Sequence, residues 1–160
     1  MKLPFCALLT CILVGASALI YAANQQSTQF NVSISIKETC NITAANSADL
    51  DFGSINRASK GSNQSNHLAV TCTQGTPYRI ALQSQRAMAN AAASNNTKIP
   101  YTLYQDANRT TLWGADTQNA YSNTGTGNTQ KIPVWGQVNQ ADTNVPAGQY
   151  TDKVTAVITY

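Results

Sequence analysis

The sequence predicts an all-β protein of the antiparallel sandwich class. Short runs of alternating apolar and polar residues are separated by Gly, Asn and Ser turns, which is the pattern of half-buried strands. No segment has the apolar period of an amphipathic helix. Two cysteines, Cys40 and Cys72, remain once a leader is set aside, and both lie in strand-like contexts. The chain is long enough for one domain with a single core.

Residues 1–22 are predicted to be a secretory signal peptide. Lys2 precedes an uncharged apolar run that ends at Ile20, and Ala22 or Ala23 supplies the small residue for cleavage. The apolar run is long enough to span a membrane, but no basic cluster follows it. An exported chain meets an oxidising compartment, so a Cys40–Cys72 disulfide is expected.

The N-terminal part of the exported chain is predicted to contain a strand at residues 30–36. Phe30, Val32, Ile34 and Ile36 share one face of it. Further strands are expected at residues 50–53, 67–72, 78–82, 99–104, 111–114 and 130–136, with loops at 56–66, 86–96 and 119–129. The prolines inside two of these patterns, Pro100 and Pro133, indicate sheet edges or bulges.

The C-terminal part is predicted to be a buried strand over residues 150–160. Pro146 and Gly148 form the preceding turn. The residues that share one face of the strand are Tyr150, Val154, Ala156, Ile158 and Tyr160. A β-protein that starts with an apparently spare strand and ends on a buried one suggests a subunit that exchanges strands.

Composition and motifs argue against an enzyme and against a nucleic-acid or membrane-surface partner. Charged residues are 11% of the chain, and neither Lys nor Arg clusters anywhere. His67 has no identifiable orienting acid, and Asp49 and Asp51 are typical of a solvated strand edge. No metal or phosphate motif occurs, so neither cofactor nor metal nor small-molecule substrate is expected. Trp113 and Trp135 have two interpretations, a sugar-stacking platform or core aromatics, and the second is commoner.

A series of short motifs resembles the spore coat protein U domain, a family that includes the pilin subunits of archaic, Csu-type chaperone–usher pili. Each motif is weak alone, and their order and spacing together are specific over roughly residues 30–160. The chain departs from the family at residues 82–88, where a glycine often follows the strand. The motifs are Cys40-x-Ile42 and the matching residues within 50–53, 70–78, 100–106, 112–114, 134–136 and 147–154.

This resemblance implies an incomplete immunoglobulin-like antiparallel β-sandwich that is completed by a donor strand. Residues 23–37 would be an extension with the donor strand, and residues 38–160 the pilin domain. The donor side chains would be Phe30, Val32, Ile34 and Ile36. The acceptor groove would run along the C-terminal strand, with Tyr150, Val154, Ala156, Ile158 and Tyr160, and would be bounded by a strand from the N-terminal half.

The resemblance also implies a function. The expected role is a shaft or adaptor subunit of a pilus on the cell surface, which supports surface attachment and biofilm formation. The expected partners are neighbouring pilin subunits, a periplasmic chaperone and an outer-membrane usher. A tip adhesin is disfavoured because the chain has one domain and carries a donor segment. The alternatives are a secreted coat protein of the same fold and a carbohydrate-binding module.

Overall fold

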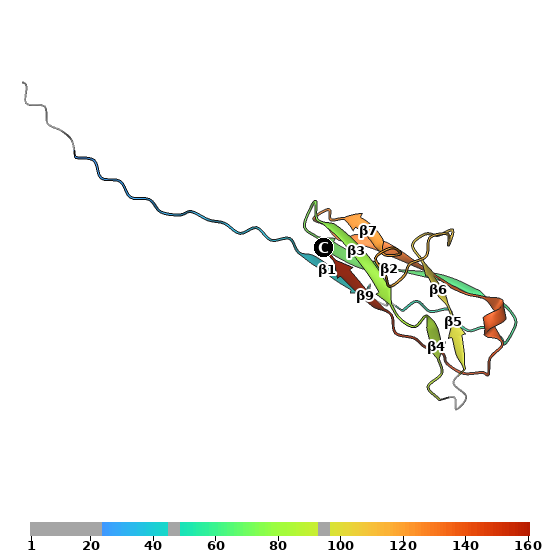
Figure 1. Ribbon diagram of the computed structural model, residues 1–160. Helices are drawn as coiled ribbons and strands as arrows, with labels where there is room; N and C mark the ends of the chain where they lie inside the picture. The colour runs from blue at the N-terminus through green and yellow to red at the C-terminus, as the bar shows by residue number, and fades with distance from the viewer. Residues whose placement is uncertain (1–23, 45–48, 93–96) are drawn as a thin grey trace, which may run out of the picture. The chain divides into compact units, whose positions relative to one another are not determined.

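The computed structural model describes residues 24–44, 49–92 and 97–160, so the expected signal peptide lies outside the described residues. The chain divides into two units at Ser35 and Ile36. In the first unit, residues 24–35 are exposed and pair with no strand of the described chain. The second unit contains all the sheets (Figure 1).

Two antiparallel sheets form the body of the second unit. The four-stranded sheet has the order β1-β2-β8-β6, with β1 (Cys40–Ala44), β2 (Ser62–Cys72), β8 (Gln130–Val138) and β6 (Thr102–Tyr104). The three-stranded sheet has the order β7-β3-β9, with β7 (Tyr121–Thr124), β3 (Pro77–Gln83) and β9 (Thr155–Thr159). The predicted antiparallel β-sandwich is confirmed.

A small hairpin and one short helix complete the described secondary structure. β4 (Ala87–Ala89) pairs with β5 (Lys98–Pro100), and the 3-10 helix η1 spans Gln140–Thr143. An isolated bridge joins Ala89 to Thr151, so the hairpin lies against the segment that leads into β9.

The core lies between the two sheets because alternate residues of each strand point inward. In β3, for example, Tyr78, Ile80 and Leu82 are buried. The predicted disulfide is confirmed: Cys40 and Cys72 are directly opposite in the β1–β2 register and are bonded. The buried apolar side chains are those of Val70, Cys72, Tyr78, Ile80, Leu82, Tyr101, Leu103, Trp113, Ile132, Val134 and Val138.

Three predicted loops contain strands. β2 begins within the predicted loop 56–66, β4 lies within 86–96, and β7 lies within 119–129. Their sequences are rich in Ser, Asn, Thr and Ala, which carry little strand signal alone. Pairing with a neighbouring strand supplies the stability that composition does not show.

Three of the strands predicted between residues 50 and 114 are broken or absent, and residues 30–36 form no strand within this chain. Residues 99–104 divide at Tyr101 into β5 and β6, which belong to different sheets. Residues 111–114 form only an isolated bridge between Leu112 and Tyr104. Residues 50–53 pair with no strand of the described chain, and Leu50 and Phe52 pack against the core.

Pro133 is an exception to the expectation that strand prolines mark edges. β8 lies between β2 and β6, and Pro133 is opposite His67 on β2. On the other side of β8, the partner strand β6 pairs with residues Trp135 to Gln137 and does not extend as far as Pro133. The missing N–H of proline therefore leaves no ladder bond unmade there.

Within the described residues, no helix is long and apolar enough to cross a bilayer.

We expect loss of the disulfide to lower the free energy of unfolding by roughly 3.5–4 kcal/mol, because the bond closes a long loop. The Cys40→Ser/Cys72→Ser double variant would show this in urea denaturation. Reduced wild-type protein is the control and should unfold at the same midpoint. A midpoint equal to that of the oxidised protein would contradict the expectation.

Candidate functional site: an open seam between two edge strands

Two edge strands lie close to one another along one side of the sandwich without pairing. β1 is the edge of the four-stranded sheet and β9 the edge of the three-stranded sheet. They contact each other across the gap between the sheets, and Figure 1 shows them side by side. We call the free edges of Cys40–Ala44 and Thr155–Thr159, with Ile42, Ala156 and Ile158 between them, the open seam.

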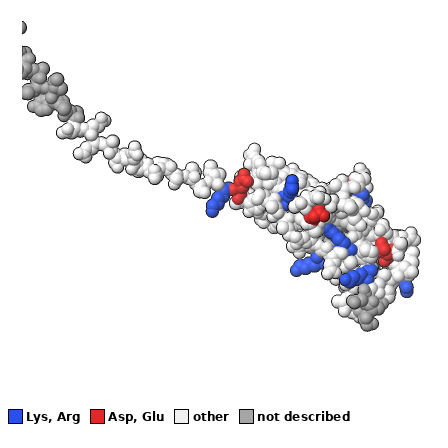
Figure 2. Space-filling model, viewed as in Figure 1, with Lys and Arg blue, Asp and Glu red and all other residues white. Residues whose placement is uncertain are grey.

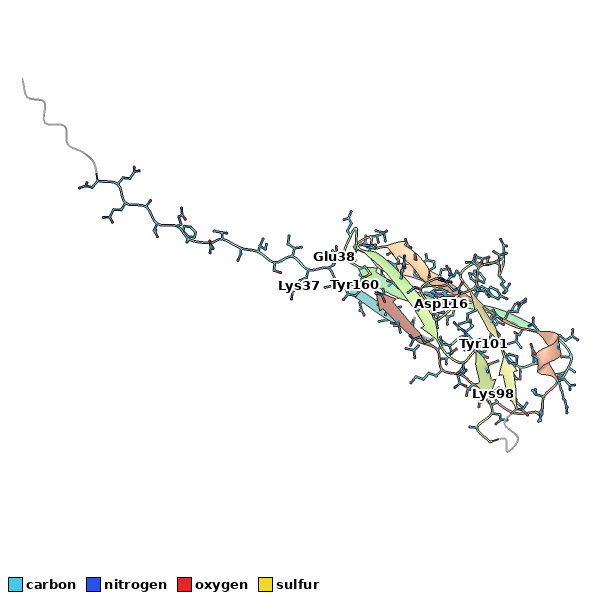
Figure 3. The ribbon with its side chains drawn as sticks, in the orientation of Figure 1. Lys37, Glu38, Lys98, Tyr101, Asp116 and Tyr160 are labelled. Atoms are coloured by element: carbon cyan, nitrogen blue, oxygen red, sulfur yellow. A yellow bond between two sulfur atoms is a disulfide. The ribbon has the colours of Figure 1, made fainter. Side chains whose placement is uncertain are left out.

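The two strands of the open seam run in opposite directions. β1 begins at Cys40, opposite Cys72 at the end of β2. A turn then leads into β3, where Arg79 is opposite Thr159, at the end of β9. β1 therefore starts where β9 ends. Figure 3 shows the same arrangement, with Lys37, Glu38 and Tyr160 at one end of the unit and Lys98 toward the other.

The floor of the open seam is apolar and only half covered. Ile42, Ala156 and Ile158 pack against the core but remain partly exposed. Residues at the same level in β3 are fully buried, Ile80 among them. This part of the core is therefore less covered than the part under β3, and extra apolar side chains placed there would be shielded from water.

Neither edge of the open seam carries the features that normally prevent edge-to-edge association. The sequences CNITA and TAVIT contain no charged residue and no proline. The pairing registers of β1 and β9 run without a bulge. Unprotected edges with unpaired N–H and C=O groups are templates for another strand. The seam is thus suited to β-strand addition.

The opposite side of the sandwich is closed by the segment around Trp113. The Trp113 N–H donates to the Leu103 carbonyl of β6, and the Gly114 carbonyl accepts from Leu82 of β3. The segment therefore crosses from one sheet to the other. The indole Nε1–H of Trp113 donates to the Ile80 carbonyl at 2.8 Å, and its ring packs on Tyr121. The segment therefore covers the free edge of β6 on this side, whereas no segment of the described chain lies between β1 and β9 at the seam.

A partly buried polar cluster fixes the residues that lead into β9. The hydroxyl of Tyr101 donates to Asp152 Oδ2 at 2.7 Å and lies 3.1 Å from Ser84 Oγ. The Arg86 guanidinium donates to the carbonyls of Leu82 and Trp113. Burial raises the pKa of Tyr101 and lowers the pKa of Arg86. The cluster ties the start of the seam to both sheets.

The four predicted donor side chains are all solvent-exposed. Phe30, Val32, Ile34 and Ile36 have exposed fractions of 83%, 86%, 87% and 86%. Residues 24–39 belong to no sheet of the described chain. A row of four large apolar side chains in water is a recognisable signature of an unfilled interaction.

The predicted acceptor strand is shorter in the structure than in the sequence prediction. β9 spans Thr155–Thr159, so only Ala156 and Ile158 of the five predicted residues belong to it. Val154 and Tyr160 flank it and are exposed. Tyr150 lies in the preceding turn, where its hydroxyl donates to the Pro146 carbonyl. Asp152 lies before the start of β9 and accepts a hydrogen bond from the Tyr101 hydroxyl.

The sugar-stacking interpretation of Trp113 and Trp135 is wrong. Trp113 is 1% exposed, and the Arg109 guanidinium lies over the ring of Trp135 at 5.9 Å. The two tryptophans therefore present no shared flat face.

Other chemistry finds little support in the described chain. No group of three or more potential metal ligands occurs there. Asp51 accepts a hydrogen bond from the Gly53 N–H and lies in a segment that is exposed but forms no strand, so the expected strand edge is absent there. Figure 2 shows the Lys and Arg side chains scattered among Asp and Glu on the face in view.

Two features of the site were missed by the sequence prediction. The Tyr101–Asp152 contact joins positions 51 apart, and no local pattern connects them. The closing role of residues 111–114 was also missed, although the bulk of Trp113 beside Gly114 was a signal that the segment enters the core.

Comparison with protein families gave a match to the Spore Coat Protein U domain over residues 26–157. One similar solved structure is a chaperone-tip adhesion subunit pre-assembly complex from archaic chaperone–usher Csu pili of Acinetobacter baumannii. The TM-score is 0.52 at 21% identity, over 78% of this chain and 40% of that chain. A chaperone-tip adhesin complex of CFA/I fimbriae biogenesis also matches, with a TM-score of 0.39 at 14% identity, over 75% of this chain and 41% of that one. Comparison with curated proteins gave no significant match.

The family match covers most of the chain, so this protein belongs to the Spore Coat Protein U domain family. The predicted resemblance is confirmed. The first solved structure shares the fold, and this chain spans less than half of its length.

We expect Tyr101→Phe to lower the free energy of unfolding by about 1–1.5 kcal/mol, because the hydrogen bond to the Asp152 carboxylate is lost. Tyr150→Phe is the matched control, since that hydroxyl contacts an exposed carbonyl, and it should change stability by less than about 0.5 kcal/mol. Urea denaturation compares the two. Equal effects would show that the Tyr101–Asp152 contact has no special role.

Proposed function

We propose that this protein is a structural subunit of a chaperone–usher pilus that is joined to its neighbours by donor-strand exchange. Residues 30–36 of one copy fill the open seam of the next. The observation that carries the proposal is the match between an unfilled apolar seam with two bare edges and an exposed segment with four alternating apolar side chains. Family membership supports the same role.

The energetics favour this exchange. Burying four large apolar side chains releases on the order of 6–12 kcal/mol before ordering costs are subtracted. The added strand also satisfies backbone groups of β9, which lacks a partner on that side within the described chain. A shift of one residue would place Asn31, Ser33 and Ser35 over the apolar floor, so the register is enforced.

A filament requires a particular direction of the donor strand. If the strand runs antiparallel to β9, the donor's folded domain lies at the Thr155 end of the seam. The acceptor's own segment is joined to its domain through Lys37 and Glu38, which lie at the other end of the seam with Tyr160. Each copy then uses two different ends, and association continues as an open filament. If the donor strand instead runs parallel to β9, the donor's domain lies at the same end of the seam as the acceptor's own segment. The product is then a closed dimer, or a monomer that has inserted its own segment.

One antiparallel register places a donor apolar side chain opposite each apolar residue on the seam face of β9. It also buries Val154 and Tyr160, which flank the strand and are otherwise exposed. A shift of two residues would leave one apolar side chain of the donor or the acceptor uncovered. The opposed pairs in this register are Phe30 with Tyr160, Val32 with Ile158, Ile34 with Ala156, and Ile36 with Val154.

The cellular setting follows from this assembly. A free monomer exposes both its seam and its segment, so a periplasmic chaperone would cap the seam and an outer-membrane usher would catalyse the exchange. The assembled pilus lies outside the cell and supports surface attachment and biofilm formation. The exposed segment suits a shaft or adaptor position, in which a subunit both donates and accepts a strand.

We expect Ile34→Asp to abolish self-association of the exported protein, because a charge would enter the apolar seam. The binding free energy between copies should fall by about 3 kcal/mol or more, which raises the dissociation constant by over about 100-fold. Ser33→Asp is the matched control, since Ser33 faces outward in the same strand. On an unboiled gel, wild type and Ser33→Asp should form a ladder and Ile34→Asp should not. A ladder with all three proteins would reject donor-strand exchange through this segment.

We expect the pair Ser35→Cys/Thr155→Cys to form a disulfide between copies, because the two positions are opposite in the proposed antiparallel register. Ser35→Cys/Thr159→Cys should not cross-link, since those positions lie at opposite ends of the strand. Non-reducing gels after mild oxidation distinguish the two. Cross-linking of the second pair alone would reverse the direction of the donor strand and exclude a filament of this design.

A further inference from the structure

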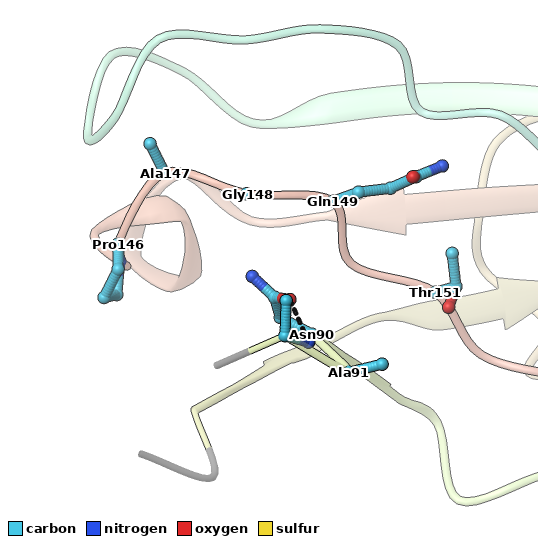
Figure 4. A pocket seen from close by; sticks show the side chains of 8 residues that line it. Asn90, Ala91, Pro146, Ala147, Gly148, Gln149 and Thr151 are labelled. Carbon is cyan, nitrogen blue, oxygen red and sulfur yellow. Dashed lines mark hydrogen bonds between the residues drawn. The ribbon is translucent and has the colours of Figure 1, made fainter. Parts of the chain in front are cut away.

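We infer that a hollow beyond the first residue of β9 is a second contact surface between copies, where the donor copy's residues 37–39 leave the seam. The hollow has a volume of about 470 Å³. It is formed by residues 90–92 on one side and by residues 146–149 with Thr151 on the other (Figure 4). This inference rests on the proposed function and adds a contact surface to it.

The hollow is located at the end of the seam where the donor's domain must lie. Thr151 forms one of its walls and is bridged to Ala89 of β4. β9 begins four positions later, at Thr155. A donor strand antiparallel to β9 brings Ile36 to this end, so the donor's next residues emerge beside the hollow.

The donor's linker is too short to avoid this region. Only residues 37–39 separate Ile36 from Cys40, the first residue of β1. Fully extended, the chain from Ile36 to Cys40 spans at most about 14 Å. The donor's first strand must therefore begin within that distance of the end of the seam.

Charge at the end of the seam directs the linker away from β9. Continued antiparallel pairing would place Lys37 opposite Lys153 and Glu38 opposite Asp152. Like charges directly opposite on neighbouring strands are destabilising. Asp152 cannot turn aside, because its carboxylate accepts hydrogen bonds from Tyr101 and from the Lys153 N–H. The ladder therefore ends after Ile36, and the linker leaves it beside the hollow.

The walls of the hollow suit a short polar peptide. No charged side chain lines it, and its side chains are small or carry an amide. The Asn90 side chain is fixed by accepting a hydrogen bond from the Ala92 N–H at 2.9 Å. Its amide lies so close to Gly148 that a Cβ there would overlap it. The absence of a side chain at Gly148 leaves room for this amide.

Disulfide trapping in the full exported chain tests this surface. Glu38→Cys is combined with Gln149→Cys on one wall, or with Ala92→Cys on the other. After mild oxidation, a boiled, non-reduced gel should retain a covalent ladder with at least one of these pairs, at ten times or more the yield of the control. The control pairs Glu38→Cys with Ser122→Cys, an exposed position on β7 two strands away from β9.

The outcomes separate this inference from the proposed function. If Ser35→Cys/Thr155→Cys cross-links but neither hollow pair does, the second contact surface is rejected and donor-strand exchange stands. If the unboiled wild-type protein forms no ladder, both fail together. A covalent ladder through the hollow, with the reduced variants still forming the unboiled ladder, supports the second surface.

Discussion

The unpaired backbone N–H and C=O groups along the free edges of β1 and β9 are the constraint on which the proposed assembly depends. These two edges face each other, and no strand of the described chain lies between them. A β-sandwich normally protects such edges with charge, proline, bulges or a covering segment. This chain protects one side in that way, through Trp113 and the residues around it, and leaves the other side bare. Of these two sides of the described sandwich, the seam is therefore the one that offers two facing free edges to a strand.

The disulfide and the Tyr101–Asp152 contact act on the two halves of this arrangement. The Cys40–Cys72 disulfide holds the five-residue edge strand β1 on the sheet. Without it, β1 would be held only by its backbone hydrogen bonds to β2. Tyr101 holds the residues that precede β9. The open seam has unpaired backbone groups but keeps its shape, because the disulfide fixes β1 and the Tyr101–Asp152 contact fixes the residues before β9.

Much of the fold could be predicted from the sequence where alternation was strong. Residues 78–82 and 130–136 were identified as strands because their apolar residues recur at every second position. The weaker cases, such as β7, are polar and are strands only because β3 lies beside them. The seam itself was predicted only in part, because the alternation of residues 150–160 could not show that pairing with β3 begins at Thr155 or that Asp152 contacts Tyr101.

The shortness of residues 37–39 has a mechanical consequence for the proposed filament. A tensile force along the filament is transmitted to the donor strand through residues 37–39, which are too few to extend much further. The load then acts along the strand axis, so the hydrogen bonds to β9 and the four buried side chains resist together and cannot be peeled one at a time. Such a joint would yield at a rate set by the unfolding barrier of the subunit, whatever its equilibrium affinity.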